Sequence, residues 1–368
     1  MNRPLLTPLA ESLPATVPFV GPEAQERHRG RPFRARLGAN ESGFGPSPAV
    51  KAAIADAAGQ TWMYGDPESA DLRAKLSQKL GVTPQNIVIG EGIDALLGLI
   101  VRLWAGSGQA VVTSLGAYPT FNYHVAGFGA RLITVPYKHD RESLSALLDA
   151  VKRENASLVY LANPDNPMGT WWPADDVGRF IDALPETTML VLDEAYGETA
   201  PLGTLPPLDV ARPNLLRMRT FSKAYGLAGL RCGYAIGEAQ TINAFEKVRN
   251  HFGMTRMAQT AALAALDDEA YLHSVIADVA ACRDRLSSIA AANGLSAIPS
   301  ATNFVTIDCG SDGAFAMKVM QQLIARDVFV RKPMAPGLDR CIRVSVGPAA
   351  EIDLFEVELP EALAAAGA

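Results

Sequence analysis

One lysine lies in a setting that suits covalent chemistry. Lys223 is surrounded by small and apolar residues in the segment TFSKAYGLAGLR (residues 220–231), with Ser222 beside it and Arg231 eight positions later. Burial and a neighbouring cation disfavour the ammonium form of a lysine and leave a nucleophilic amine. The segment therefore predicts an imine-forming amine with an anion-binding site next to it.

Three more polar segments each follow an apolar run that is typical of a strand. They are GEGID (residues 90–94), NPDNPMG (residues 163–169) and DEAY (residues 193–196). Ligands of open α/β sheets lie beyond the carboxyl ends of the strands, and the N–H groups at a helix start favour a phosphate. The four segments together predict one polar site that binds an anion.

A sheet must bring these segments together, and the chain from about residue 60 to 240 has the pattern of one. Short apolar runs alternate with helical periods, as in strand–helix–strand units with right-handed crossovers. Continuously apolar runs suit strands that are buried on both faces of a parallel sheet. We predict an α/β layered fold with strands at residues 86–90, 110–114, 131–136, 157–162, 189–193 and 215–219 and helices at residues 93–104 and 144–152.

The sequence pattern changes after about residue 240. Alanine-rich helical sequence is expected from about 241 to 292, including one long stretch at 258–280, and a final helix ends the chain. Strand-like pieces at 303–308 and 341–346 predict a second, smaller α+β domain. We expect an N-terminal arm and part of the small domain at residues 1–60, the large domain at 61–245 and the rest of the small domain at 246–368.

Composition and charge argue against several classes of protein. The 368 residues carry 33 basic and 39 acidic side chains, and the net charge of −6 argues against nucleic-acid or anionic-membrane partners. The four cysteines lack CxxC spacing and the five histidines lack HxxxH spacing, so we expect reduced thiols and no metal site. Prolines interrupt the first 20 residues before a signal peptide can form, and no apolar run is long enough to cross a bilayer. We expect a cytoplasmic protein of enzyme size.

The order of these motifs resembles that of a known family. TFSKAYGLAGLRCGY is similar to the lysine-attachment motif of the class I/II aminotransferases, which depend on pyridoxal phosphate (PLP) and have fold type I; NPDNPMG and DEAY match its preceding motifs. The resemblance implies a large domain with a mostly parallel seven-stranded sheet between helices, and a smaller α+β domain. The histidinol-phosphate aminotransferase branch is the most similar, through residues 37–48, 64–67, 119–121, 330–334 and 342–347.

The resemblance implies roles in cofactor binding. Lys223 would bind PLP covalently and then carry a proton between the substrate's α-carbon and the cofactor. Asp193 would pair with the pyridine nitrogen and keep it protonated, so that the ring withdraws electrons. Asn166 and Tyr196 would donate hydrogen bonds to the ring oxygen, and Phe121 would stack on the ring face.

The phosphate of PLP would be held at a helix start, where charge-assisted bonds and the helix dipole combine. Tyr64 would reach this phosphate from the neighbouring subunit, which implies a homodimer with shared active sites. The remaining phosphate ligands that the resemblance implies are Gly92, Ile93, Asp94, Ser222 and Arg231.

The substrate would be held by its anionic group. Arg343 resembles the family's substrate-anion arginine, Arg331 is a second candidate, and Asn40 of LGANESGFGPSP is expected on the substrate side with them. Guanidinium groups bind carboxylates and phosphates alike, so the kind of anion stays open. The family implies amino transfer between an amino donor and a 2-oxo acid, with glutamate and 2-oxoglutarate as the common pair. L-histidinol phosphate is the leading substrate and an aromatic amino acid the next.

Other interpretations stay open beside this one. Asp193 could cap a helix, Phe121 could be a packing aromatic and Arg343 could form a surface ion pair. A decarboxylase similar to threonine-phosphate decarboxylase would use the same cofactor residues, and a PLP-binding regulator or a nicotinamide-dependent oxidoreductase are more distant alternatives. Residues 249–255 (RNHFGMT) stand where histidinol-phosphate enzymes commonly have an Arg-Pro-Pro-Phe-Asn-like stretch, so the substrate is not decided.

Overall fold

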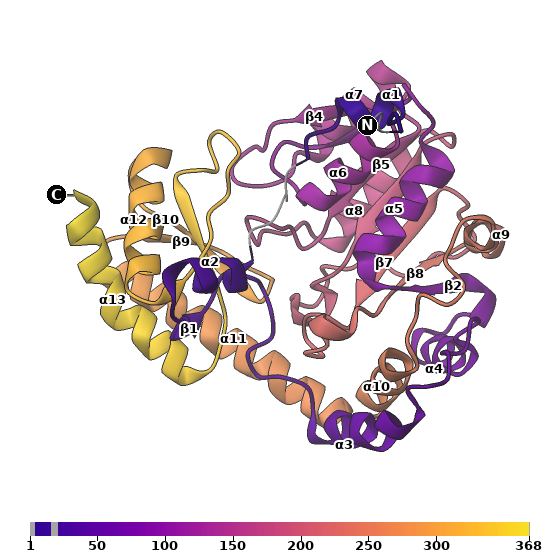
Figure 1. Cartoon of the computed structure of the whole chain (residues 1–368). Coiled ribbons are helices and arrows are strands. Elements are labelled where there is room, and N and C mark those ends of the chain that lie inside the picture. The colour runs from indigo at the N-terminus through magenta and orange to yellow at the C-terminus, as the bar shows by residue number, and fades with distance from the viewer. Residues whose placement is uncertain (1–3, 16–20, 368) are drawn as a thin grey trace.

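The computed structural model describes residues 4–15 and 21–367, and a seven-stranded sheet lies in the larger part of the molecule (Figure 1). The strand order is β2-β8-β7-β6-β5-β3-β4, and only β8 runs antiparallel to its neighbours among the described strands of this sheet. The predicted mostly parallel sheet is confirmed. Its strands are β2 (Ile87–Gly90), β3 (Ala110–Ser114), β4 (Arg131–Val135), β5 (Leu158–Ala162), β6 (Met189–Asp193), β7 (Leu215–Thr220) and β8 (Gly233–Gly237).

Helices cover both faces of this sheet. Alternate residues of β5 face opposite sides: Leu158 and Tyr160 pack in one buried cluster with α5 and α6, whereas Val159 and Leu161 pack in another with α7 and α8. Burial on both faces explains why the strands are continuously apolar. The covering helices are α5 (Gly92–Trp104), α6 (Pro119–Gly127), α7 (Leu144–Glu154), α8 (Ala174–Ala183) and α9 (Ala239–Asn243).

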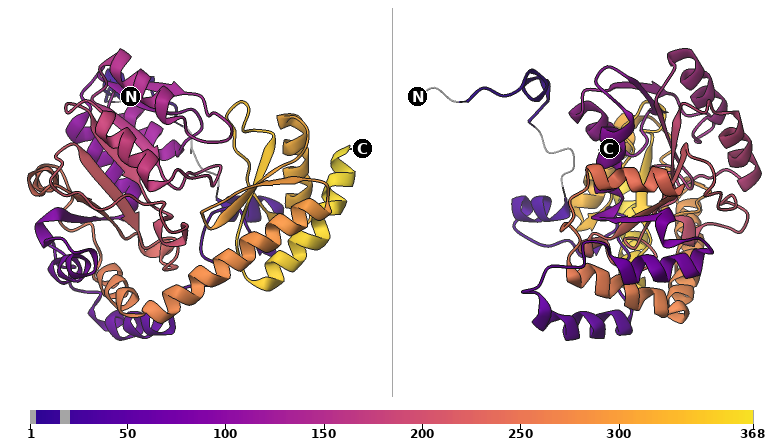
Figure 2. Two further views of the ribbon diagram at one scale, coloured as in Figure 1. Left: turned by 180° about the vertical axis from the view of Figure 1, so that it is seen from behind. Right: turned by 90° about the vertical axis from the view of Figure 1, so that its right-hand side faces the viewer.

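A second group of elements forms a smaller unit beside the large sheet (Figures 1 and 2). A three-stranded antiparallel sheet packs against three helices, and the short strand β1 (Ala35–Arg36) pairs in parallel with β11 (Val328–Phe329). This pairing joins the N-terminal segment to the C-terminal part of the chain, although the domain boundaries themselves stay a prediction. The other elements are α2 (Pro22–Arg29), α11 (Glu269–Ala292), β9 (Ser296–Ile298), β10 (Phe304–Asp308), α12 (Gly313–Ala325), β12 (Cys341–Ser345) and α13 (Ala349–Gly367).

The alanine-rich region differs from the single long stretch that we expected. It is divided at Asp268, whose side chain accepts a hydrogen bond from the N–H of Tyr271 and so caps a new helix, α11. The helix before the break, α10 (Arg256–Asp267), packs with α3 (Pro48–Ala57) and α4 (Ala70–Leu80). The remaining described helices are short: α1 (Pro8–Ser12) and 3₁₀ turns at Ala58–Gln60, Pro84–Asn86, Gly197–Thr199, Ala228–Leu230 and Ala244–Lys247.

Within residues 4–15 and 21–367, no helix combines the length and the apolar character that crossing a bilayer requires.

Candidate active site

The carboxyl ends of the parallel strands meet at one edge of the sheet, and the predicted polar segments lie there. Gly92 begins α5 after β2, Asn166 lies in the turn after β5, Asp193 ends β6 and Lys223 follows β7. Strand β12 of the smaller unit reaches the same edge. The guanidinium of Arg343, which lies on this strand, donates to Asn166 Oδ1 at 2.5 Å. The site therefore lies between the two units.

Lys223 presents its amine at this edge. Its Nζ donates to the main-chain carbonyl of Asn40 at 2.9 Å and lies 5.5 Å from the ring centroid of Tyr196. Burial lowers the pKa of Lys223 to about 8, and the cations Arg343 and Arg231 add to that effect. About a tenth of the amine is therefore neutral at pH 7, far more than for a lysine of ordinary pKa, and the neutral amine is the form that attacks.

Asp193 is a buried carboxylate with neutral partners. Its Oδ2 accepts from the hydroxyl of Tyr160 at 2.7 Å and its Oδ1 from the N–H of Ala195 at 2.9 Å. Burial raises the pKa of Asp193 to about 6, against the opposing effect of these two bonds. Within the described part of the chain, no ion pair to Asp193 is found.

Tyr196 and Asn166 both lie close to Arg343. Tyr196 is 3% exposed, and its ring meets that of Phe304 edge-on at a centroid distance of 5.6 Å. Arg343 also lies over Phe304, 5.2 Å from the ring centroid. The structure thus brings the predicted pair Tyr196 and Asn166 to the same wall as the predicted anion-binding arginine.

A helix start and an arginine form a small cradle. Gly92 opens α5 with φ +79°, and a Cβ added there would lie 2.4 Å from Nη2 of Arg231. The same nitrogen lies 3.8 Å from a carboxylate oxygen of Asp94, and Ile93 between them is buried. Only a residue without a side chain leaves room for the guanidinium above these N–H groups. Ser222, also buried, accepts a hydrogen bond from the hydroxyl of Thr220 at the end of β7.

Phe121 lies in the core of the large unit. Its side chain has no exposed surface and stacks on Tyr160 inside the core, with ring centroids 4.7 Å apart. Phe121 is the third residue of α6 and packs in the buried cluster between this helix and the sheet. The predicted stacking of Phe121 on a cofactor ring stays a prediction.

Tyr118 is a second aromatic residue near the start of α6, and it was not predicted as a site residue. It precedes α6, is partly exposed, and donates from its hydroxyl to a carboxylate oxygen of Asp94 at 2.6 Å. Burial of the hydroxyl, followed by the charge of Asp94, raises the pKa of Tyr118 above its usual value. The signal was available, because Tyr118 stands in the loop after β3 at the carboxyl edge.

Arg343 and Arg331 lie on neighbouring backbone segments. Their main chains form an antiparallel bridge in which each N–H donates to the other's carbonyl, at 2.6 and 3.2 Å. Burial lowers the pKa of Arg343 to about 10 and also lowers the pKa of Arg331. The Nε of Arg343 is buried and makes no hydrogen bond to a described residue. Such a cation is short of partners and suits an incoming anion.

Tyr64 lies on the surface of the subunit. It is 77% exposed, and its ring packs on that of Phe252 with centroids 5.0 Å apart. The main-chain carbonyl of Tyr64 accepts from Arg256, which starts α10. No hydrogen bond or ring contact of Tyr64 with the predicted cofactor residues occurs among the described residues of this subunit.

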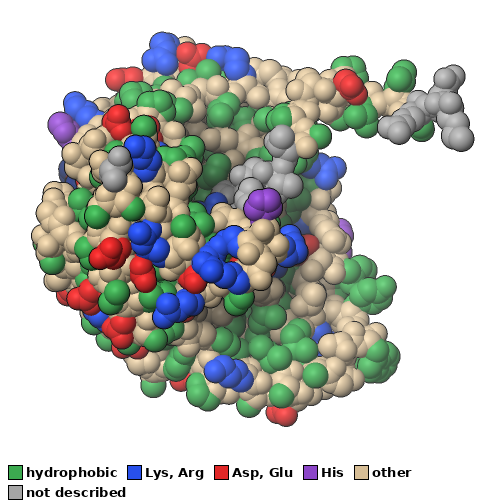
Figure 3. Space-filling view, turned by 60° about the vertical axis from the view of Figure 1, so that its left-hand side comes forward, with side chains coloured by type: hydrophobic (Ala, Val, Ile, Leu, Met, Phe, Trp, Pro, Cys, Tyr) green, Lys and Arg blue, Asp and Glu red, His purple; other side chains and the backbone are tan. Residues whose placement is uncertain are grey.

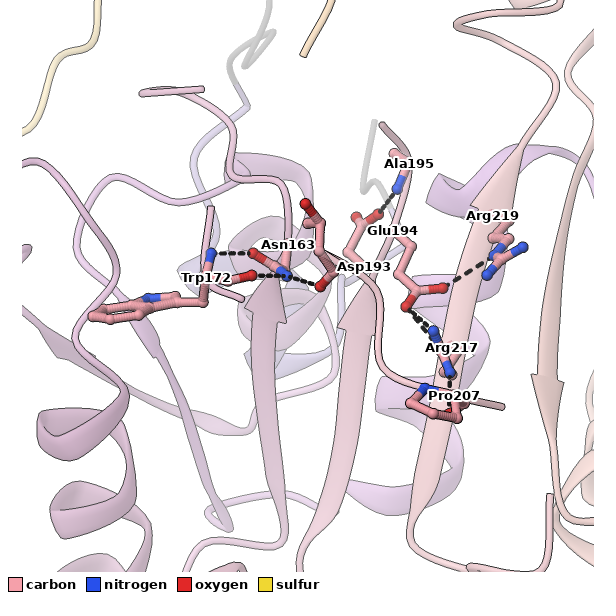
Figure 4. A network of polar contacts seen from close by, with 9 residues as sticks. Asn163, Trp172, Asp193, Glu194, Ala195, Pro207, Arg217 and Arg219 are labelled. Atoms are coloured by element: carbon pink, nitrogen blue, oxygen red, sulfur yellow. Dashed lines mark hydrogen bonds and ion pairs between the residues drawn. The ribbon is translucent and has the colours of Figure 1, made fainter. Parts of the chain in front are cut away.

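A buried ion network lies directly behind Asp193 and was not predicted (Figure 4). Glu194 is fully buried; its Oε1 accepts from Nε of Arg217 at 2.9 Å and its Oε2 from Nε of Arg219 at 3.0 Å. Arg217 also donates to the carbonyl of Pro207 at 2.8 Å. Two arginines in alternate positions of an otherwise apolar strand, β7, were the signal for a buried charge partner. The network ties β6 to β7 next to Asp193.

These residues fit PLP on observations of this structure. The buried carboxylate of Asp193 lacks a cation, and a protonated pyridine nitrogen would supply one. The amine of Lys223 has a lowered pKa, and the cradle at Gly92 and Arg231 offers N–H groups and a cation to a phosphate. An amine, an acid and an anion cradle thus meet at one sheet edge.

Comparisons with known proteins agree with this geometry. A family model described as aminotransferase class I and II matches residues 35–355. A histidinol-phosphate aminotransferase from Sinorhizobium meliloti, solved in complex with pyridoxal-5'-phosphate, is 58% identical, with a TM-score of 0.95 and 98% of this chain and 97% of that chain covered. Histidinol-phosphate aminotransferase 1 of Thiobacillus denitrificans is 38% identical over 339 residues, which is 90% of this chain and 86% of the relative.

A more distant structure shares the fold alone. A Thermus thermophilus aspartate aminotransferase variant is 22% identical with a TM-score of 0.78, and it covers 89% of this chain. The architecture is that of fold type I, as predicted, and the match of the family model extends over most of the sequence. The chain therefore belongs to the class I and II aminotransferases.

Proposed function

We propose that this chain is a PLP-dependent histidinol-phosphate aminotransferase that acts as a homodimer. The observation that carries the proposal is the 58% identity, over 98% of the chain, to the Sinorhizobium meliloti enzyme. It is supported by the meeting of Lys223, Asp193 and the Gly92–Arg231 cradle at one edge of the sheet.

PLP, when bound, supplies a carbonyl group for an amine and a ring that withdraws electrons from the substrate's α-carbon. Lys223 would hold the cofactor through its amine, and its free amine would carry a proton at the substrate's α-carbon. Asp193 holds a proton on the pyridine nitrogen, because the ion pair offsets the cost of its burial. Asn166 and Tyr196 would donate hydrogen bonds to the ring oxygen, and Phe121 in the first turn of α6 would stack on the ring face.

The phosphate group is oriented by Ser222, Arg231 and the N–H groups at the start of α5, from Gly92 to Asp94. Tyr64 of the partner subunit completes this set. Support for a dimer comes from the exposure of Tyr64 and of its neighbours Trp62 and Phe252, at 77%, 82% and 58%. Exposed aromatic clusters are typical of protein interfaces. The space-filling view shows a hollowed face with hydrophobic side chains exposed along it (Figure 3).

The substrate's anion binds Arg343, and Arg331 is a second ligand. Arg343 already has a carbonyl or amide partner on each of two nitrogens, from Gly38 and Asn166, so an incoming anion meets a guanidinium that is held in place. Asn40 is hydrogen-bonded to Ser345 of strand β12 and to Lys223, and we propose that it acts from the substrate side. The amino group passes to a 2-oxo acid, with 2-oxoglutarate and glutamate as the proposed pair. The four cysteines are unpaired, and we propose the cytoplasm as the place of action.

A spectroscopic and a kinetic measurement test this function. Purified protein supplied with PLP should gain a visible absorption band that borohydride removes, with a pyridoxyl group fixed on Lys223. Glutamate should form from 2-oxoglutarate faster with L-histidinol phosphate than with phenylalanine or tyrosine. Preference for an aromatic amino acid would reassign the substrate, release of CO2 from threonine phosphate would indicate a decarboxylase, and the absence of the band would refute the proposal.

A further inference from the structure

Asn40 is held in an unusual conformation at the centre of the site. It is 2% exposed and has φ +54°, the left-handed region that side chains rarely adopt. Its main-chain carbonyl accepts from Nζ of Lys223 at 2.9 Å and from Nδ2 of Asn303 at 3.1 Å. Asparagine adopts this region more readily than most residues with side chains, and the contact of its carbonyl with the reactive lysine indicates that its position matters for function.

Ser345 fixes the other side of Asn40 by two hydrogen bonds. Its Oγ accepts from the main-chain N–H of Asn40 at 3.0 Å and donates to Asn40 Oδ1 at 3.1 Å. Ser345 lies in β12 two residues after Arg343, so both side chains stand on the same face of that strand. The strand that carries the anion-binding arginine therefore also holds Asn40.

The side-chain amide of Asn40 continues this chain to Tyr196. Its Nδ2 donates to Tyr196 Oη at 3.1 Å. The opposite orientation of the amide would direct Nδ2 at Ser345, and the hydroxyl hydrogen of Ser345 would then have no acceptor among the described residues. The hydroxyl of Ser345 thus selects the orientation in which Asn40 donates to Tyr196.

The hydroxyl hydrogen of Tyr196 must then point away from Asn40. Because Tyr196 Oη accepts from Asn40, its own hydrogen is directed away from Asn40, and no described residue accepts it. The charged groups that act on Tyr196 are Arg343, Asp193 and Asp165, with Lys223 5.5 Å from the ring centroid. Burial raises the pKa of Tyr196 to about 12, so the hydroxyl keeps its hydrogen at neutral pH.

We propose that Ser345 is a positioning residue: through Asn40 it orients the hydroxyl of Tyr196 so that its hydrogen points into the cofactor site. The inference rests on the proposed function, because the acceptor is the ring oxygen of PLP. It gives a role to Ser345 of the smaller unit, which would act on the cofactor through three successive hydrogen bonds: to Asn40, from Asn40 to Tyr196 and from Tyr196 to the ring oxygen. A donor to the ring oxygen lowers the proton affinity of the bound cofactor, so the orientation is measurable.

The experiment is a pH titration of the visible absorption band of the PLP-loaded enzyme. Tyr196→Phe removes the donor and should raise the pKa of this band. Ser345→Ala should raise it in the same direction by about half a pH unit to one pH unit, the effect of one hydrogen bond. Ser345→Thr keeps the hydroxyl and should restore the wild-type value. Thr188→Ala, which removes a buried hydroxyl at the opposite end of β6, is the matched control and should leave the band unchanged.

The double variant Ser345→Ala/Tyr196→Phe decides whether Ser345 acts through Tyr196. The effect of Ser345→Ala should disappear in the Tyr196→Phe background. A shift that persists there, or a wild-type pKa in Ser345→Ala, would overturn the inference while leaving the proposed function intact. Absence of the band from the wild-type protein would instead overturn the proposed function, and this inference with it. If Ser345→Ala does not fold, Asn40→Ala breaks the same chain and should give the same shift.

Discussion

The amine of Lys223 lies at the edge of the sheet but is largely removed from water. The cost of burying its charge appears as a lowered pKa of this amine. The value of about 8 means that protonated amine dominates below pH 8 and neutral amine above it. Desolvation is the main cause, and the neighbouring cations Arg343 and Arg231 act in the same direction. The same shift that prepares the amine for attack therefore makes its reactivity depend on pH near neutrality.

The rate at which the PLP-free enzyme takes up PLP covalently should follow this ionisation. Below pH 8 we expect the rate to rise about tenfold per pH unit, and above pH 8 to level off, because only the neutral amine attacks. Stopped-flow absorbance of the visible band measures it. Lys223→Ala should show no band, and Lys51→Ala, at an exposed lysine, should behave as wild type. A rate that is flat from pH 6 to 9 would contradict the assignment.

At the scale of elements, the start of α5 shows how a backbone conformation makes a binding site. Gly92 has φ +79°, and its missing side chain leaves the space in which the guanidinium of Arg231 lies. Gly108 has nearly the same φ, +78°, but nothing lies within 4 Å of the position that a Cβ would take. The two glycines differ in their surroundings and agree in backbone conformation.

Gly92→Ala and Gly108→Ala should therefore separate strain from binding. Both substitutions should cost about 1 kcal/mol of stability, since each places a side chain at positive φ. Only Gly92→Ala should also weaken PLP binding, by about tenfold or more, because it displaces Arg231 from the phosphate. Equilibrium unfolding and a fluorescence titration with PLP measure the two effects. Equal PLP affinity in the two variants would count against the cradle.

Buried ion pairs join the end of β6 to β7. Glu194→Gln removes the carboxylate that both Arg217 and Arg219 share, and Arg217 is only 2% exposed. We expect a loss of about 3 to 5 kcal/mol in the free energy of unfolding, because a buried arginine is left without its counter-charge. Urea unfolding of the PLP-free protein measures the change. Asp176→Asn breaks the exposed pair with Arg179 and should cost less than about 1 kcal/mol; similar losses would refute the argument.

At the scale of the whole molecule, the aromatic patch of Trp62, Tyr64 and Phe252 is the surface that the proposed dimer explains. Phe252→Asp places a charge in this patch and should give a monomer. PLP affinity should fall in the same variant, since Tyr64 of the partner subunit no longer reaches the phosphate. Sedimentation velocity and a PLP titration test both parts. Val357→Asp, at a 64% exposed position on α13, is the control and should remain dimeric; a dimeric Phe252→Asp with normal affinity would place the interface elsewhere.

Much of the large unit could be predicted from local pattern. The strand ranges around residues 110–114 and 189–193 agree with β3 and β6, because continuous apolar runs between polar segments are a local property. The positions of Asp193 and Lys223 at strand ends follow from the same pattern of apolar runs and polar segments. The burial of Phe121 against Tyr160 could not be predicted, since one sequence motif contains two aromatics and only the packing of α6 decides which of them faces the core.

The sequence by itself determined the strand order along the chain, the fold class and the chemistry-bearing motifs, because these depend on residue type and short-range spacing. Tertiary structure alone decided which side chains meet. Asn40 and Ser345 are 305 positions apart, and nothing in their local patterns connects them. Their contact exists because the N-terminal segment at Leu37 packs in the same core as strand β12, where the N–H of Ser345 donates to the carbonyl of Leu37. Such a long-range approach is set by the burial of a shared core.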